Sequence, residues 1–548
     1  MKSKKKVLIF TVSALVIYII AYYLTDVLKL QFYNFDKNNW DNPLESTSGI
    51  EDNPYMYDHR GKIEEIYITI ANIESDNDIE LNSFKELLYL DEATFKKYKT
   101  EAYFTDGKID VSIFKEANAG IEAKGDDVQK SFKIRLYDNA GLWNGQNIIN
   151  LHKDYSDSLR IRNKLTFDYF SIIPDVTSWN TRFVKLFIKD IGEEDFSEYG
   201  LFTHVEQPNK LALKNHRFNP NANMYKAETF NFSLYPENIK INTSKDYSKN
   251  SFEMVLEILG EEDHAKLIEM LDSVNNIDTD INLILSKYFD TENYFTWLAA
   301  NILMDHFKTS DTNFILYSPI NSPKWYFMPW DCDQAWGFEK ERPSWQFGLS
   351  AYWSNVLHRR VFEEKENLEL LNKKIEELSQ QIITPDQTQI FLDNYYNGVL
   401  SSITSLPDIK YLPVTIDNYL RQYKELPMLT EKNKSMYYAQ LEKPMPFNLN
   451  EVAIKNNSLL FSWEEAYDMQ NDTITYNFEL SKDKEFSTSI HSAKNLIENS
   501  YTLDKLSKGI YYWRVTAYDS NLNSQIPFDT YIDPFGDPFF GIRQLIIE

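Results

Sequence analysis

The stretch that decides the fold consists of three segments, NILMD (301–305), NFILY (313–317) and WYFMPWDCD (325–333). The first segment closes a helical pattern. The other two are short hydrophobic runs separated by NSP (321–323), which is typical of a β-hairpin. Such a hairpin brings Asn313 close to Asp331. A carboxylate at a helix end, an amide and a second carboxylate are the groups of a phosphoryl-transfer site, where the first orients a hydroxyl and the others hold magnesium.

Further motifs lie upstream of this stretch, namely KSFKIRL (130–136), DSLRIRNKL (157–165) and GLFTHVE (200–206). In this order, the motifs resemble those of the CotH family, the spore-coat protein H group of atypical protein kinases. The resemblance covers residues 60 to 443. It implies an α+β fold: an atypical protein-kinase-like domain with a helical C-terminal part.

The resemblance also implies roles for the acidic and amide residues. Asp305 would be the catalytic aspartate, which accepts or orients the proton of the acceptor hydroxyl. Asn313 and Asp331 would bind Mg²⁺ (or Mn²⁺) for ATP. Asp333 would be a further metal-binding residue, with a weaker claim because the family tolerates Asn at that position.

Each role has a structural alternative. An acid at the end of a helix opposes the helix dipole, which favours a functional reading of Asp305 over capping. Asn313 would serve equally as a turn residue that starts a strand. Asp331 leaves a hydrophobic run, where an unpaired carboxylate is costly, and a metal ion is its simplest partner.

The nucleotide-binding candidates are Lys130, Lys133, Arg162 and Glu206. Strand alternation directs only one of the two lysines to the α- and β-phosphates, and the family match favours Lys130. Arg162 is a candidate clamp for phosphate or carboxylate. Glu206 would meet the adenine or ribose, or pair with the lysine. Surface positions are the alternative for the lysines and Arg162.

One departure from the family concerns the turn KGDD (124–127), where the family usually has Arg-Gly-Asn-Ser. Two carboxylates there would repel the phosphates of ATP unless they point away or bind metal. The chain also lacks a Gly-x-Gly-x-x-Gly loop, as expected for an atypical kinase.

Composition restricts the class of protein. The chain has 548 residues, a net charge of −25 and enough aliphatic and aromatic residues for a sizeable core. The negative charge argues against a nucleic-acid-binding protein, because a phosphate backbone would be repelled.

The N-terminus carries lysines in residues 1–6 and an apolar run in residues 7–24. This pattern predicts a transmembrane signal anchor with a cytoplasmic N-terminus and the bulk of the chain outside the cytoplasm. Residues 25–58 then form a stalk or linker. The alternative is a cleaved secretion signal, which would release the protein from the membrane.

The remaining chain divides at the KPMP sequence (443–446). Before it, residues 59–443 would form the kinase-like domain, with strands at 66–70, 100–104, 109–114, 120–124 and 131–136, a hairpin at 183–205, and helices at 155–172, 251–303 and 355–440. After it, residues 444–548 read as strands only. Trp463 in an early strand and a tyrosine in the run at 506–515 resemble the core Trp and tyrosine corner of a fibronectin type III domain.

These observations give two main hypotheses. The first is a membrane-anchored, extracytoplasmic kinase that transfers the γ-phosphoryl group of ATP to Ser or Thr of surface or coat proteins. The second is a catalytically inactive scaffold in cell-envelope or spore-coat assembly. Transfer of another group, such as AMP, is a third reading that the sequence does not separate from the first.

Overall fold

The computed structural model describes residues 52–57, 61–75, 81, 83–125, 127–337, 342–455 and 458–547. The predicted tail, membrane anchor and most of the stalk lie outside these residues, as does Asp126 of the KGDD turn. Within the described residues, no helix combines the length and apolar character needed to cross a membrane.

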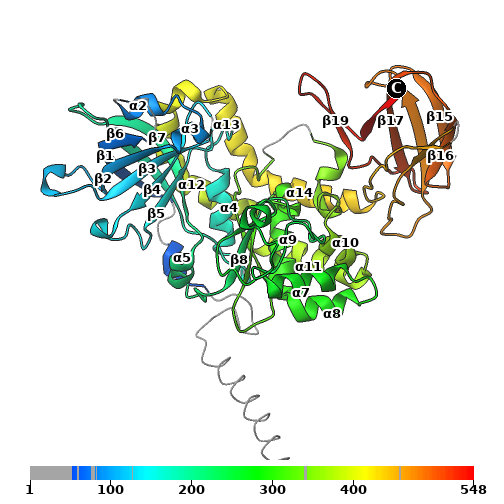
Figure 1. Ribbon diagram of the computed structural model, residues 1–548, viewed down its shortest axis with the longest axis horizontal. Coiled ribbons are helices and arrows are strands. Elements are labelled where there is room, and N and C mark those ends of the chain that lie inside the picture. Colours follow the sequence, from blue (N-terminus) through cyan, green and yellow to red (C-terminus); the bar gives the residue numbers. More distant parts are fainter. Residues whose placement is uncertain are drawn as a thin grey trace, which may run out of the picture.

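Seven strands between residues 63 and 206 form a closed β-barrel with strand order β1-β2-β3-β4-β5-β7-β6 (Figure 1, blue to cyan). Strands β1 and β6 pair in parallel, and the other neighbours are antiparallel. Side chains alternate, so Phe132 and Ile134 fill the barrel while Lys133 lies on its outer face. The strands are β1 (Ile63–Ser75), β2 (Tyr98–Thr105), β3 (Ala119–Lys124), β4 (Ser131–Leu136), β5 (Ile148–His152), β6 (Thr181–Lys189) and β7 (Ser197–Glu206).

Short helices accompany the barrel, and a second, largely helical part follows it (Figure 1, green to yellow). The second part contains a sheet of order β11-β10-β8-β9, built from β8 (Asn223–Ala227), β9 (Leu256–Ile258), β10 (Phe314–Ser318) and β11 (Tyr326–Pro329). The α-helices are α2 (Phe84–Leu87), α3 (Glu92–Phe95), α4 (Arg162–Phe170), α5 (Lys210–Asn215), α6 (Lys249–Glu253), α7 (Ala265–Asn275), α8 (Ile281–Tyr288), α9 (Thr291–Leu303), α10 (Val356–Phe362), α11 (Lys365–Gln381), α12 (Pro385–Ile403), α13 (Ile416–Glu425) and α14 (Leu429–Leu441).

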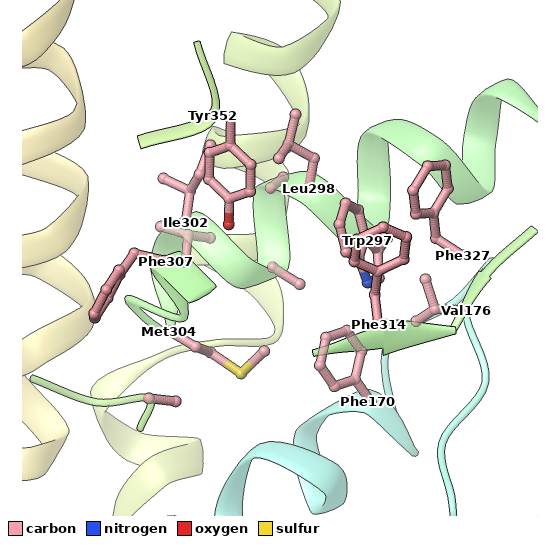
Figure 2. Packing of buried hydrophobic residues seen from close by; sticks show 14 of the residues in the cluster. Phe170, Val176, Trp297, Leu298, Ile302, Met304, Phe307, Phe314, Phe327 and Tyr352 are labelled. Carbon is pink, nitrogen blue, oxygen red and sulfur yellow. The ribbon is translucent and has the colours of Figure 1, made fainter. Parts of the chain in front are cut away.

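Helix α9 forms the centre of the second part. Its Asp290 N-cap accepts a hydrogen bond from the Asn293 amide, and the helix is buried on nearly every side. Trp297 stacks on Phe327 of β11 with ring centroids 4.5 Å apart, and Phe314 of β10 packs beside them (Figure 2). This packing fixes the end of α9 relative to both strands of the hairpin.

The structure confirms the predicted β6–β7 and β10–β11 hairpins and the helical zone from 355 to 440. The predicted strand at 109–114 is wrong. Residues Val111–Ile113 form a 3₁₀ turn, in which the Asp110 carboxylate accepts from the Ser112 amide, and Ile109 and Ile113 are exposed. The zone at 251–303 is interrupted by β9, and that at 155–172 is helical only in α4.

The C-terminal part is a β-sandwich (Figure 1, orange to red). One sheet has the order β12-β13-β16, and the other has the order β15-β14-β17-β18, with β21 also paired to β17. Trp463 is buried, and the Tyr511 hydroxyl donates to the Ser507 carbonyl at 2.8 Å. The fibronectin relationship remains a prediction. The strands are β12 (Ala453–Lys455), β13 (Ser458–Ser462), β14 (Thr475–Ser481), β15 (Ser489–Leu496), β16 (Ser500–Asp504), β17 (Gly509–Tyr518), β18 (Ser524–Gln525), β19 (Thr530–Ile532), β20 (Pro538–Phe540) and β21 (Ile542–Ile547).

Candidate active site

The β10–β11 hairpin brings Asn313 and Asp331 together. Phe314 pairs with Pro329 at the open end of the hairpin, and just beyond this pair the Asn313 Nδ2 donates to the Asp331 main-chain carbonyl at 2.8 Å. Asn313 and Asp331 have φ angles of 56° and 47°. Non-glycine residues adopt this left-handed conformation at a cost, and such residues cluster at functional sites.

Asp305 is the third candidate site residue with a left-handed backbone conformation, with φ of 56°. It terminates α9 in a Schellman motif: the His306 amide donates to the Asn301 carbonyl, and the Asp305 amide donates to the Ile302 carbonyl. Glycine is the usual residue at this position. An aspartate therefore occupies a position where glycine would cost less, which supports a functional role.

The segment after Asp331 returns to the end of α9. The Trp336 amide donates to the Met304 carbonyl at 2.7 Å, and the Trp336 indole nitrogen donates to Thr166 of α4. The Cys332 amide donates to Asn163, also on α4. The hairpin end, the α9 end and α4 are thus connected by hydrogen bonds.

Asp305 forms an ion pair with Arg342, with 2.7 Å between Oδ2 and Nη2. The arginine side chain is 3% exposed and lies over the rings of Phe307 and Phe347. Burial raises the pKa of Asp305, and the charge of Arg342 opposes this increase. Both residues line a cavity of about 540 Å³, together with Arg162, Trp336, Arg421 and Lys432.

A cluster of carboxylates surrounds Asp333. Burial, followed by the charges of Asp331, Asp154 and Asp157, raises the pKa of Asp333 to about 9. Burial and the charges of Asp157 and Asp331 raise the pKa of Asp154 to about 7. The Oδ1 atom of Asp333 and the Oδ2 atom of Asp154 are buried, and neither has a hydrogen-bond partner among the described residues. Oxygen-only donors with unmatched negative charge are what Mg²⁺ or Mn²⁺ requires, so the residues fit the metal.

The two lysine candidates lie in different surroundings. Lys133 pairs in register with Asn150 of β5, two residues before His152, so all three share the outer face of the barrel. His152 and Asp331 are close enough that the charge of each shifts the pKa of the other. The outer face that carries Lys133 therefore meets the second part of the molecule at Asp331.

Lys130 instead donates to the Gly125 carbonyl at 2.8 Å and lines another cavity, with Tyr199, Phe202 and Lys153. Lys133 rather than Lys130 therefore shares the face that meets Asp331. Phosphate binding by either lysine stays a prediction.

Arg162 and Glu206 both have partners within the protein. Arg162 at the start of α4 pairs with Asp157, whose carboxylate also accepts from the amides of Leu159 and Ile161. Glu206 is fully buried and accepts from His216, Gln146 and the Asn180 amide. Neither strand lysine is a hydrogen-bond partner of Glu206 within the described residues. Its contact with nucleotide stays a prediction.

Sequence reasoning did not assign a role to His152, Asp154, Asp157, Lys308 or Arg342. Asp157 opens the DSLRIRNKL motif, so the motif itself was an available signal. Lys308 lies three residues after Asp305, and its charge lowers the pKa of Asp331 and Asp333. No sequence signal points to Arg342, because its contact with Asp305 depends on the tertiary fold.

Comparisons with known proteins identify a family and a relative. Residues 124–437 match the family described as CotH kinase protein. Inner spore coat protein H of Bacillus subtilis (strain 168) is 24% identical over 263 residues, which cover 47% of this chain and 68% of that protein.

Among solved structures, domains d3–d4 of the rat CD45 extracellular region match with 14% identity and a TM-score of 0.14, covering 19% of this chain and 48% of that one. A complex of HipA, HipB and operator DNA from Shewanella oneidensis matches with 10% identity and a TM-score of 0.19, covering 61% of this chain and 67% of that one. The family match spans more than half of the chain, and the protein therefore belongs to the CotH kinase protein family.

Proposed function

We propose that the protein is a metal-dependent protein kinase that transfers the γ-phosphoryl group of ATP to Ser or Thr residues of surface or coat proteins. The observation that carries this proposal is the joined pair Asn313–Asp331 beside the unpartnered carboxylate oxygens of Asp333 and Asp154. A bound cation would match the negative charge that these buried carboxylates carry when they ionise.

The chemistry follows from the placement of the side chains. Asp305 would accept or orient the proton of the acceptor hydroxyl, as a buried carboxylate with a raised pKa is suited to do. Lys133 would hold the phosphates from the barrel side, and Lys308 would offset negative charge near Asp331. Asn313, Asp331 and Asp333 would hold Mg²⁺ or Mn²⁺, which supplies charge neutralisation for the phosphates when it is bound.

The cavity at Asp305 is the proposed entrance for the acceptor. Its lining includes Arg421 and Lys432 as well as the Arg162 and Arg342 side chains. Arg162 and Arg342 are paired with Asp157 and Asp305, and Glu425 also lines the cavity. Arg421 and Lys432 leave the cavity with a small excess of positive charge, which favours an acceptor that carries negative charge beside its hydroxyl group. Acidic segments that contain Ser or Thr are therefore the substrates to test first.

The proposed location is outside the cytoplasm, with residues 7–24 as the membrane anchor. Two observations support this location: the sequence pattern of the N-terminus, and the similarity to a protein named as an inner spore coat component. A protein in this location would act on proteins of the same compartment, namely surface or coat proteins.

The proposal is tested by nucleotide-dependent thermal stability. A ligand that binds the native state raises the melting temperature, so ATP with Mg²⁺ or Mn²⁺ should stabilise the wild type. The shift should require both metal and nucleotide, and Asp331→Asn should remove it without lowering the melting temperature of the free protein. An equal shift in the variant would contradict the assignment of Asp331.

An inactive scaffold is the second candidate, and the Asp305–Arg342 pair favours it. An arginine that occupies the catalytic carboxylate leaves one fewer oxygen for the acceptor hydroxyl. No thermal shift in the wild type with either metal would make this the better account.

A further inference from the structure

The C-terminal sandwich carries a cluster of three aspartates at the end that faces helix α14. Asp468 and Asp472 lie in the loop between β13 and β14, and Asp519 follows β17. One carboxylate oxygen from each lies within 4.8 Å of the others. Loops that follow these two strands meet at one end of a sandwich, which explains why residues 50 positions apart come together.

The carboxylate of Asp468 is buried with an unmatched oxygen. Asp468 is 5% exposed, and its Oδ1 accepts from the amides of Gln470 and Asp472. Its Oδ2 is buried without a hydrogen-bond partner among the described residues. Leaving a buried carboxylate oxygen unpaired is costly, so this atom requires a ligand.

A second loop in the same sandwich shows how such a charge is otherwise matched. Asp533 binds the amides of Phe535 and Asp537 through Oδ1, with the same spacing as Asp468. Its Oδ2, however, pairs with Lys484. Within the described ranges, no Lys, Arg or His pairs with Asp468, Asp472 or Asp519. The loop of Asp468 therefore has no described cation in the position that Lys484 occupies beside Asp533.

We propose that Asp468, Asp472 and Asp519 form a calcium-binding site. Three carboxylates in irregular loops suit Ca²⁺, which accepts flexible, oxygen-only coordination, better than Mg²⁺, which demands a regular octahedron. Asp468 and Asp472 also line a cavity of about 750 Å³, which gives an ion a route from solvent.

The proposed calcium site lies at the joint between the sandwich and the kinase-like domain. The Gln470 Nε2, in the loop of Asp468 and Asp472, donates to the Leu441 carbonyl at the end of α14. The Asn523 Nδ2, which also donates to Asp519, bonds the Glu442 carbonyl. Calcium that fixes both loops therefore stabilises the attachment of the sandwich to α14.

The test is calcium titration of the full-length chain after removal of metal by a chelator, from about 10 µM to about 10 mM Ca²⁺. Calorimetry should show one calcium bound per chain at this cluster, and the melting temperature should rise with Ca²⁺. Asp468→Asn keeps the Oδ1 acceptor but removes the unmatched charge. This variant and Asp472→Asn should weaken binding at least about tenfold.

Two variants serve as controls. Asp537→Asn changes the residue that corresponds to Asp472 in the lysine-paired loop, and it should bind calcium as the wild type does. Asp331→Asn separates this site from the proposed active site and should also retain calcium binding. Calcium should further slow proteolysis of residues 442–452.

Several results would overturn the proposal. These are wild-type affinity in Asp468→Asn and Asp472→Asn, calcium binding that disappears in Asp331→Asn, displacement of Ca²⁺ by an equal concentration of Mg²⁺, or unchanged proteolysis at the joint. Since the site does not involve nucleotide, failure here leaves the kinase proposal intact.

Discussion

Asn313 and Asp331 are joined by a hydrogen bond of 2.8 Å from the Asn313 side-chain amide to the Asp331 main-chain carbonyl. The bond uses the nitrogen of the amide, so the Asn313 Oδ1 remains the atom suited to a metal ion. Two left-handed residues that would otherwise be strained are thereby held in one arrangement.

Asn313→Asp tests this hydrogen bond, because Asn and Asp side chains both tolerate a left-handed backbone. The new carboxylate cannot donate and would oppose the Asp331 carbonyl. The free energy of unfolding should fall by about 1–3 kcal/mol, as measured by urea denaturation. Asn495→Asp makes the same change at an exposed left-handed position of the sandwich and should have little effect. Equal losses in both variants would show that the bond does not matter.

The Asp305–Arg342 pair predicts a shift in the pH profile of phosphoryl transfer. Burial raises the pKa of Asp305, and Arg342 opposes the increase, so Arg342→Gln should raise this pKa further. Asp305 would then be deprotonated only at higher pH. The acidic limb of kcat/KM against pH should move upward by about 1–3 units.

Arg421→Gln is the matched control for Arg342→Gln. Arg421 lines the same cavity but makes no ion pair with Asp305 among the described residues. In Arg421→Gln, the acidic limb of kcat/KM against pH should stay at its wild-type position. A downward shift in Arg342→Gln would contradict the assignment of Asp305 as the base.

Asp333 should destabilise the metal-free protein as pH rises. Its folded pKa is raised to about 9, above the ordinary value of 3.8, so the native state prefers the protonated form. The contribution of Asp333 to stability is therefore most favourable below pH 3.8, and it is lost progressively as the pH rises to about 9. Asp333→Asn removes this loss. The variant should therefore gain stability relative to the wild type between pH 4 and pH 9, measured by thermal unfolding in chelator.

Saturating Mg²⁺ or Mn²⁺ should reduce the advantage of Asp333→Asn, because the metal favours the ionised carboxylate. A variant that is less stable than the wild type at pH 8 without metal would contradict the placement of Asp333 in an unmatched acidic cluster.

His216 should be essential for stability at neutral pH. It is fully buried between Asp52 and Glu206, with both ring nitrogens 2.7 Å from carboxylate oxygens. These charges raise its pKa well above 6.5, so the stability that it contributes is complete below pH 6.5 and is lost as pH rises through the folded pKa.

His216→Asn leaves two buried carboxylates without a cation and should cost about 3–5 kcal/mol at pH 6 in urea denaturation. The difference from the wild type should shrink at strongly alkaline pH. A cost that does not depend on pH would mean that His216 is neutral in the folded protein.

The hairpin and the central helix were predictable because their signals are local. Turn residues at 321–323 and uninterrupted apolar strands identify β10 and β11, and burial of α9 follows from its composition. Proximity of Asn313 and Asp331 followed from hairpin geometry alone.

Other features depended on tertiary contacts. Residues 109–114 alternate like a strand, but Ile109 and Ile113 have no core to cover, and the Asp110 carboxylate closes a turn instead. The bond between Glu206 and His216 joins two separate elements and has no local sequence signal. The Arg342 contact with Asp305 spans 37 residues and has no periodic signal.

The most direct test of the central claim is transfer of label from ATP that carries radioactive phosphorus at the γ position. Purified full-length protein should label itself or an acidic Ser-containing acceptor when Mg²⁺ or Mn²⁺ is present. Loss of the Arg342 pair should lower the melting temperature of Asp305→Asn. Assayed well below that temperature and with unchanged nucleotide binding, this variant should lose at least about 100-fold of the activity. Labelling that is equal in Asp305→Asn, or absent from a wild type that binds ATP and metal, would contradict the assignment of this protein as a kinase.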